Sequence, residues 1–195
     1  MNKKSIEEIL KSNRKLYIAI TGGGTSVIPT LLENGGASEI FLGAIVPYHP
    51  DELKDVIGSF DKAVSKKTAM LLSLTAFNKR ISDILVDNVE CVGIGVTASL
   101  AKNGAERAGR EHKACIGVSI IKFDKSTKRE YLEIIFGEKR TRKEEEDILA
   151  ELILAMVDMN MCLRKAHHFN NGDSTAKYLK SIGLTENDNV KWEMI

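Results

Sequence analysis

The sequence is poor in the residue types that mark disulfide-rich and metal-binding proteins. It has three cysteines, three prolines and one tryptophan among 195 residues. The cysteines are odd in number and lack CxxC spacing, and Cys91 and Cys115 lie in apolar segments. We therefore expect buried thiols in a reducing compartment. No metal site is expected, because His167 and His168 lack a third ligand at metal-binding spacing.

Long apolar segments and an excess of one charge are also absent. No stretch approaches the roughly 20 apolar residues of a transmembrane helix, and the first 15 residues are too acidic and amphipathic for a secretory signal. The 28 basic and 27 acidic residues nearly cancel, so a nucleic-acid partner would need a local patch. We expect a cytoplasmic protein without membrane or nucleic-acid partners.

The sequence does contain an ordinary globular mixture, with 43% hydrophobic and 28% charged residues. Short apolar runs predict strands at 16–20, 39–46, 90–97, 114–123 and 128–136. Helical spacing predicts helices at 5–13, 25–34, 51–57, 65–80, 141–164 and 174–182. This order predicts an α/β protein, a three-layer α/β/α sandwich with a mixed sheet.

We place this domain at residues 1–166, followed by a C-terminal extension at 167–195. The extension contains Trp192, the only tryptophan. Because a lone exposed tryptophan is uncommon, we expect the extension to pack onto the body or onto a neighbouring subunit.

A glycine-rich loop at residues 20–26 leaves the first strand and enters a helix. Glycines let the backbone approach a ligand, and the free amides of a helix start favour an anion. The candidate ligand-binding residues are Gly22, Gly23, Gly24 and Ser26, with hydroxyls also at Thr21 and Thr25. The alternative is a tight turn in which Thr25 or Ser26 caps the helix, because the loop is neither a P-loop nor GxGxxG.

Two further strand exits carry polar side chains. Tyr48 and His49 follow the second strand, and parallel strands should bring this exit beside the glycine loop. Tyr48 could stack on a base, and His49 could transfer protons near neutral pH. A turn framed by two prolines is the alternative.

The third strand exit offers the hydroxyls of Thr97 and Ser99, and the loop after it is basic. The candidate phosphate ligands there are Arg107, Arg110, His112 and Lys113. The alternative is a solvated surface loop.

The start of the longest helix is a fourth candidate. Thr141 is the expected cap, and the acidic run 144–147 suits the positive end of the helix dipole. Arg140 and Arg142 could still reach a phosphate.

Together these loops resemble the CinA C-terminal domain family. Residues 36–48 are similar to its GAS-x-x-FLGG-x-V-x-Y stretch, residues 93–97 to a strand ending in threonine, and residues 136–140 to an F-x-G-x-R element. The sequence resembles one divergent branch more closely. In that branch a CinA-like domain precedes a nicotinamide-nucleotide adenylyltransferase-like domain. Its TGGGS, VVPY, T-G-SL and R-x-REEED motifs resemble residues 21–25, 45–48, 97–100 and 140–147.

The resemblance covers about residues 16–164 and implies the family's fold, a homo-oligomer and a ligand similar to nicotinamide mononucleotide. The family's amidases use a nucleophilic serine and a lysine. Here Thr21 aligns with the serine and Leu53 with the lysine, while Lys54 comes one residue late. The resemblance therefore implies a nucleotide-binding domain with a degenerate amidase site and no cofactor.

Two alternatives remain open. An active amidase would release ammonia from nicotinamide mononucleotide, with Thr21 or Thr25 as the nucleophile and Lys54 or His49 as the base. Tyr48 would belong to the same catalytic site, and the glycine-loop amides would form the oxyanion hole. A non-catalytic interaction subunit would instead partner a separate nucleotidyltransferase.

Overall fold

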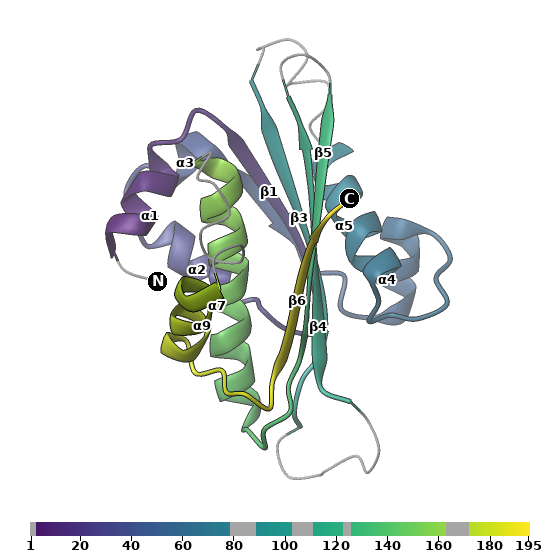
Figure 1. The fold of residues 1–195 in the computed structure, drawn as a ribbon. Coiled ribbons are helices and arrows are strands. Elements are labelled where there is room, and N and C mark those ends of the chain that lie inside the picture. The colour runs from purple at the N-terminus through teal and green to yellow at the C-terminus, as the bar shows by residue number, and fades with distance from the viewer. Residues whose placement is uncertain (1–2, 79–88, 103–110, 123–125, 163–171) are drawn as a thin grey trace.

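A computed structural model describes residues 3–78, 89–102, 111–122, 126–162 and 172–195 (Figure 1). These residues form a six-stranded sheet with the strand order β2-β1-β3-β4-β5-β6. The strands are β1 (Lys15–Thr21), β2 (Phe41–Ile45), β3 (Cys91–Ser99), β4 (Lys113–Ile121), β5 (Thr127–Ile135) and β6 (Asn189–Met194). Strands β2, β1 and β3 are parallel, and the rest pair antiparallel. The mixed sheet is as predicted.

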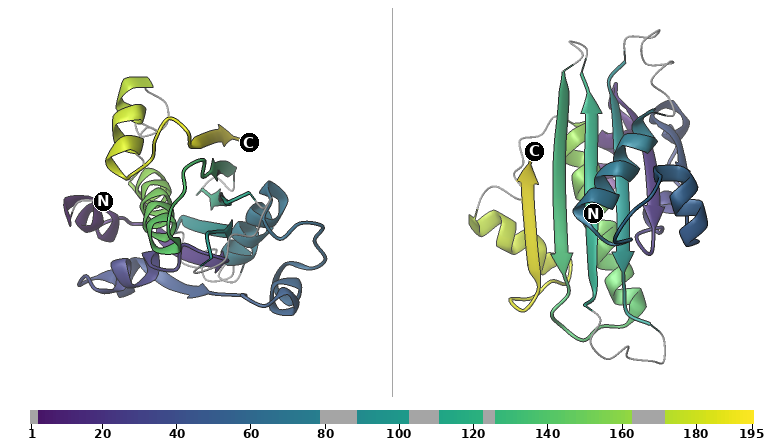
Figure 2. Two further views of the ribbon diagram at one scale, coloured as in Figure 1. Left: turned by 90° about the horizontal axis from the view of Figure 1, so that it is seen from below. Right: turned by 90° about the vertical axis from the view of Figure 1, so that its right-hand side faces the viewer.

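Helices cover both faces of this sheet, which confirms the three-layer architecture (Figures 1 and 2). On one face lie α1 (Lys3–Leu10), α2 (Val27–Leu32), α3 (Ala37–Ile40), α7 (Arg142–Met161) and α9 (Gly172–Ser181). On the other lie α4 (Pro50–Ile57) and α5 (Lys66–Asn78). None of the helices in the described ranges combines the length and apolar character needed to cross a bilayer.

Helix α7 is the central element of the larger helical layer. As expected, Thr141 caps it: the Glu144 backbone amide donates to Thr141 Oγ1 at 3.3 Å, and the Thr141 amide donates back to Glu144 Oε2 at 2.7 Å. After this polar start, nearly every residue from Ile148 to Met161 is buried. A helix that is buried on all sides must lie between other elements, and α7 packs between the sheet and α1, α2 and α9.

Helix α5 lies directly on the opposite face of the sheet because two strand glycines lack side chains. A Cβ atom at Gly95 would come within 2.2 Å of Ala69 O, and one at Gly117 within 2.7 Å of the same oxygen. Any larger residue at these positions would push the helix away. This close contact holds α5 directly against β3 and β4.

The strand register brings the predicted loops to one edge. Thr21 at the end of β1 lies opposite Thr97 on β3, and Ala19 lies opposite Ile45 at the end of β2. The three parallel strands therefore end together, as expected for ligand sites of α/β proteins.

The cysteine thiols of β3 and β4 are buried, as predicted. Cys91 and Cys115 are free and lie beneath the surface. Burial raises the pKa of Cys91 to about 12 and that of Cys115 to about 11. At such pKa values almost no reactive thiolate forms near neutral pH.

The C-terminal extension packs onto the body, which confirms the expectation drawn from Trp192. Strand β6 pairs antiparallel with β5, and Trp192 lies opposite Leu132 and packs against the main core. The sequence analysis missed this strand, because its alternation of polar and apolar residues is short and half of it faces solvent.

An ion pair fastens the extension. Both terminal nitrogens of Arg140 donate to Asp188, whose carboxylate also accepts from the backbone amides of Gly137 and Thr185. Burial alone would raise the pKa of Asp188, but these hydrogen bonds outweigh it and lower the pKa to about 2.

We predict that Asp188→Asn lowers the free energy of unfolding by about 2 kcal/mol, since it weakens a charge-assisted network. A carboxyl with a lowered pKa stabilises the fold above its unfolded pKa and loses this effect as the pH falls through the folded value. Wild-type stability should therefore fall between about pH 4 and pH 2, and the variant should lack part of this fall.

Urea denaturation across this pH range measures both effects. The control is Asp61→Asn, which removes an exposed carboxylate 3.7 Å from Lys67 and should change stability by less than about 1 kcal/mol. Equal losses in the two variants would contradict the role assigned to Asp188.

Candidate functional site

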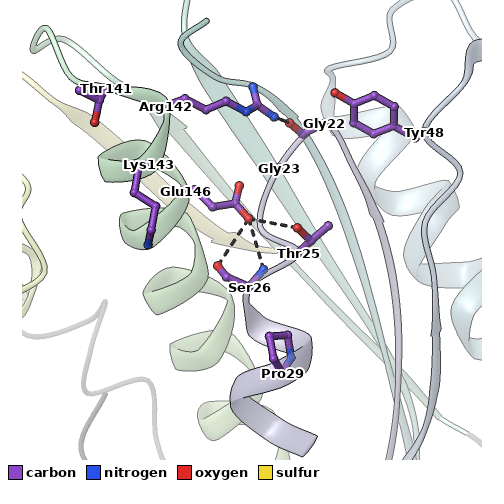
Figure 3. A pocket seen from close by; sticks show the side chains of 10 residues that line it. All are labelled: Gly22, Gly23, Thr25, Ser26, Pro29, Tyr48, Thr141, Arg142, Lys143 and Glu146. Carbon is purple, nitrogen blue, oxygen red and sulfur yellow. Dashed lines mark hydrogen bonds between the residues drawn. The ribbon is translucent and has the colours of Figure 1, made fainter. Parts of the chain in front are cut away.

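A cavity of about 690 Å³ lies at the carboxyl edge of the parallel strands (Figure 3). The glycine loop, the loop after β2 and the first turns of α7 form its walls. Its lining residues are Gly22, Gly23, Thr25, Ser26, Pro29, Tyr48, Thr141, Arg142, Lys143 and Glu146. This volume is within the usual range for sites that bind small molecules.

The loop glycines are required by packing inside the protein. Gly22 and Gly24 have φ angles of 83° and 90°, which side-chain-bearing residues rarely adopt. A Cβ atom at Gly22 would lie 1.9 Å from Ala98 O, and one at Gly24 would lie 2.4 Å from Ile153 Cδ1. The loop is thus wedged between β3 and α7, whether or not a ligand approaches it.

Glu146 of α7 occupies the amides that the sequence analysis offered to an anion. Its Oε2 accepts from the Gly24 amide at 2.8 Å, and its Oε1 accepts from the Ser26 amide at 3.2 Å. The hydroxyls of Thr25 and Ser26 donate to Oε1 at 3.3 and 3.4 Å (Figure 3). Ser26 stands at the N-cap of α2 without a capping bond from its own side chain, and Glu146 holds the chain just before the first turn of α2.

Arg142 lies one helical turn before Glu146 and holds the same loop by a carbonyl. Its guanidinium donates to Gly22 O at 2.9 Å and to Ala101 O at 3.3 Å. Among the described residues it forms no ion pair, whereas Lys143 pairs with Asp147. Arg142 therefore brings to the cavity a positive charge that no described carboxylate neutralises.

Glu145, the neighbour of Glu146, holds two neighbouring chain segments against the start of α7. Its side chain is fully buried, and it accepts from the Ala101 amide at 2.5 Å and pairs with His112 Nδ1 at 2.8 Å. These contacts tie the segment after β3 and the residue before β4 to the start of α7. His112, a predicted phosphate ligand, is thus engaged in positioning α7.

Tyr48 forms the opposite wall of the cavity, as Figure 3 shows. Its side chain is 68% exposed, an unusual degree for a large aromatic residue. The next residue, His49, caps α4 by accepting from the Asp51 amide at 3.3 Å and is exposed.

The structure brings several predicted residues together around the cavity. They are Gly22, Gly23, Thr25, Ser26, Tyr48 and Arg142, with Gly24 bound to Glu146 beside them. Of the predicted amidase nucleophiles and bases, only the alternative nucleophile Thr25 lines the cavity. Thr21 is buried at the end of β1, and Lys54 is exposed on α4, where Leu53 points inward.

Strand alternation separates the hydroxyls of β3 from the cavity. Val96 faces the core beneath α7, so Thr97 faces α5, where its hydroxyl donates to Ala63 O at 2.6 Å. The same alternation places Ser99 on the α5 side. Lys113 pairs with Ser99 across β3 and β4 and lies 3.7 Å from Glu133, on that side too.

Three further predicted positions lie away from the cavity or outside the described structure. Arg140 contacts the C-terminal extension through Asp188. Arg107 and Arg110 lie outside the described residues, as does the pair His167 and His168.

The sequence analysis missed Glu146 and Lys143 as cavity residues. It explained the acidic run by the helix dipole alone, which fits the capping residue Glu144. The available signal was the spacing of Arg142 and Glu146, because residues four apart share one face of a helix. That spacing predicts a cation and an anion aimed at the same neighbour.

Comparison with known proteins supports the fold rather than a specific activity. No protein-family model matches the sequence, and no curated protein is significantly similar to it. Solved structures do match. The competence/damage inducible protein CihA from Agrobacterium tumefaciens has a TM-score of 0.54 at 18% identity, over 83% of this chain and 96% of that one.

Two Klebsiella pneumoniae proteins give the same result. A CinA superfamily protein has a TM-score of 0.54 at 9% identity, over 83% of this chain and 95% of its own. The competence damage-inducible protein A has a TM-score of 0.53 at 10% identity, over 84% and 96%. The chain has the CinA-like fold. At such identities the likeness concerns the fold alone.

We predict that Gly22→Ala destabilises the protein far more than Gly36→Ala. Both glycines have a φ near 90°, so both variants bear a backbone cost of about 1–2 kcal/mol. Only at Gly22 does a new Cβ also collide with a backbone oxygen, while nothing lies within 4 Å of it at Gly36. We expect an extra loss of about 2 kcal/mol in urea denaturation. Equal losses would show that the loop is not wedged against β3.

Proposed function

We propose that this CinA-like domain binds a small nucleotide, of the nicotinamide mononucleotide type, in the cavity between the glycine loop and α7. The observation that carries the proposal is the guanidinium of Arg142. Two of its five N–H donors are used by the carbonyls of Gly22 and Ala101, which hold it in place. The remaining donors suit a phosphate, which arginine binds in a planar, two-pronged geometry.

Tyr48 supplies the second element of recognition. An exposed aromatic ring at the wall of a cavity of about 690 Å³ offers a surface on which a heteroaromatic base can stack. The volume accommodates a mononucleotide. A ligand with a base at one end and a phosphate at the other would thus span from Tyr48 to Arg142.

We further propose that the site does not hydrolyse the ligand. The described lining residues include no free lysine beside a hydroxyl, since the Lys143 ammonium is paired with Asp147. The hydroxyls that do line the cavity, on Thr25 and Ser26, lie 3.3 and 3.4 Å from Glu146 Oε1, which is long for a carboxylate acting as their general base. The amides of Gly24 and Ser26, which could have stabilised an oxyanion, are occupied by that same carboxylate.

We predict that the wild-type protein broadens the proton NMR signals of nicotinamide mononucleotide without producing nicotinate signals. Arg142→Ala should weaken binding at least tenfold, because a charge-assisted phosphate contact is lost. The control is Lys67→Ala, which removes an exposed cation on α5 and should bind like the wild type. Thermal melts establish that each variant is folded.

Other outcomes would contradict the proposal in distinct ways. New nicotinate signals that disappear in Thr21→Ala or Thr25→Ala would establish an amidase. Equal weakening of binding by Arg142→Ala and Lys67→Ala would show that Arg142 does not bind the phosphate. No broadening at any ligand concentration would leave an interaction subunit as the better explanation.

A further inference from the structure

We infer that Glu146 determines which part of a ligand the glycine loop accepts: its carboxylate excludes phosphate there and binds the vicinal diol of a ribose. This inference rests on the proposed function, because it assigns the orientation of a nucleotide in that same cavity.

First, the negative charge of Glu146 makes the glycine-loop end of the cavity unfavourable for a phosphate. The loop amides of Gly24 and Ser26 would otherwise attract an anion, but the carboxylate of Glu146 already satisfies them. A phosphate entering this end would face a negative charge at contact distance, and the amides of Gly24 and Ser26 would not be free to compensate for it. The phosphate is therefore directed toward Arg142, one helical turn away.

The second step concerns the acceptor capacity of the carboxylate. Two carboxylate oxygens offer about four acceptor sites. Glu146 Oε2 uses one, for the Gly24 amide at 2.8 Å. The three contacts of Oε1, at 3.2, 3.3 and 3.4 Å, are long for bonds to a carboxylate, which are usually about 2.7–2.9 Å. The two hydroxyl contacts can thus yield to a better donor.

The third step identifies that donor. Glu146 lines the cavity, so a ligand can reach the second acceptor position of Oε2 and the position on Oε1 that the hydroxyls of Thr25 and Ser26 give up. Adjacent hydroxyls of a ribose can donate one hydrogen bond to each carboxylate oxygen, which is how acidic residues commonly hold a ribose. The displaced hydroxyls of Thr25 and Ser26 can then donate to the sugar oxygens.

The resulting arrangement follows the order of groups in a mononucleotide. On α7, Arg142 and Glu146 are four residues apart, so their Cβ atoms lie about 6 Å from each other on one face. Figure 3 shows the two side chains pointing from α7 toward the loop, with Tyr48 across the cavity. Arg142 and Glu146 can therefore hold adjacent groups of one ligand, the phosphate and the ribose that carries it, while the base extends into the cavity that Tyr48 also lines.

The test compares nicotinamide mononucleotide with its 2′,3′-dideoxy analogue by isothermal titration calorimetry. Wild-type protein should bind the parent nucleotide at least about tenfold more tightly, because the analogue leaves the carboxylate without its donors. In Glu146→Gln this ratio should fall below about threefold. The control is Glu52→Gln, which removes an exposed carboxylate on α4 outside the cavity and should keep the wild-type ratio.

The ratio is taken within each variant, so a variant that is partly unfolded changes both affinities alike. If wild-type protein binds both ligands equally, or if Glu146→Gln retains the full ratio, the inference is wrong while nucleotide binding stands. If the wild type binds neither ligand, the proposed function fails and this inference fails with it.

Discussion

The hydrogen bonds between α7 and the glycine loop are the constraint on which the rest of the site depends. Arg142 holds the loop by the carbonyl of Gly22, and Glu146 holds it by the amides of Gly24 and Ser26. The two contacts are complementary, since a cation takes the oxygen and an anion takes the N–H groups. Because Glu145 fixes the next segment of chain through Ala101 and His112, the loop, the exit of β3 and the start of α7 form one unit.

This unit also explains why the loop is rich in glycine. The sequence suggests a backbone that approaches a ligand, yet the near neighbours of Gly22 and Gly24 are Ala98 and Ile153. Close packing and ligand approach make the same demand on sequence, the absence of a Cβ atom. Only the three-dimensional contacts separate the two explanations, and here they favour packing for these two glycines, although Gly22 also lines the cavity.

The sequence predicted the three-layer fold and the shared edge of the parallel strands, because both follow from apolar periodicity and from the order of strands and helices. It also predicted the cap at Thr141. It could not tell which face each hydroxyl of β3 takes, since a register shift of one residue exchanges the faces. Thr97 therefore proved to bind a backbone carbonyl beneath α5. Strand β6 was missed because pairing with β5, rather than its own pattern, makes it a strand.

The polar run at the start of α7 illustrates both what local sequence rules predict and what they leave open. Local rules explain Glu144, which closes the capping box, and they assign the acidic residues after it only to the helix dipole. Yet Glu145 and Glu146 face different neighbours: one is buried beneath the site, and the other lines the cavity. Successive residues of a helix differ by about 100° in direction, so a run of like charges at a helix start can serve a cap, a brace and a cavity wall at once. The number of acidic residues in such a run therefore says less about their roles than the direction in which each one points from the helix toward the loop.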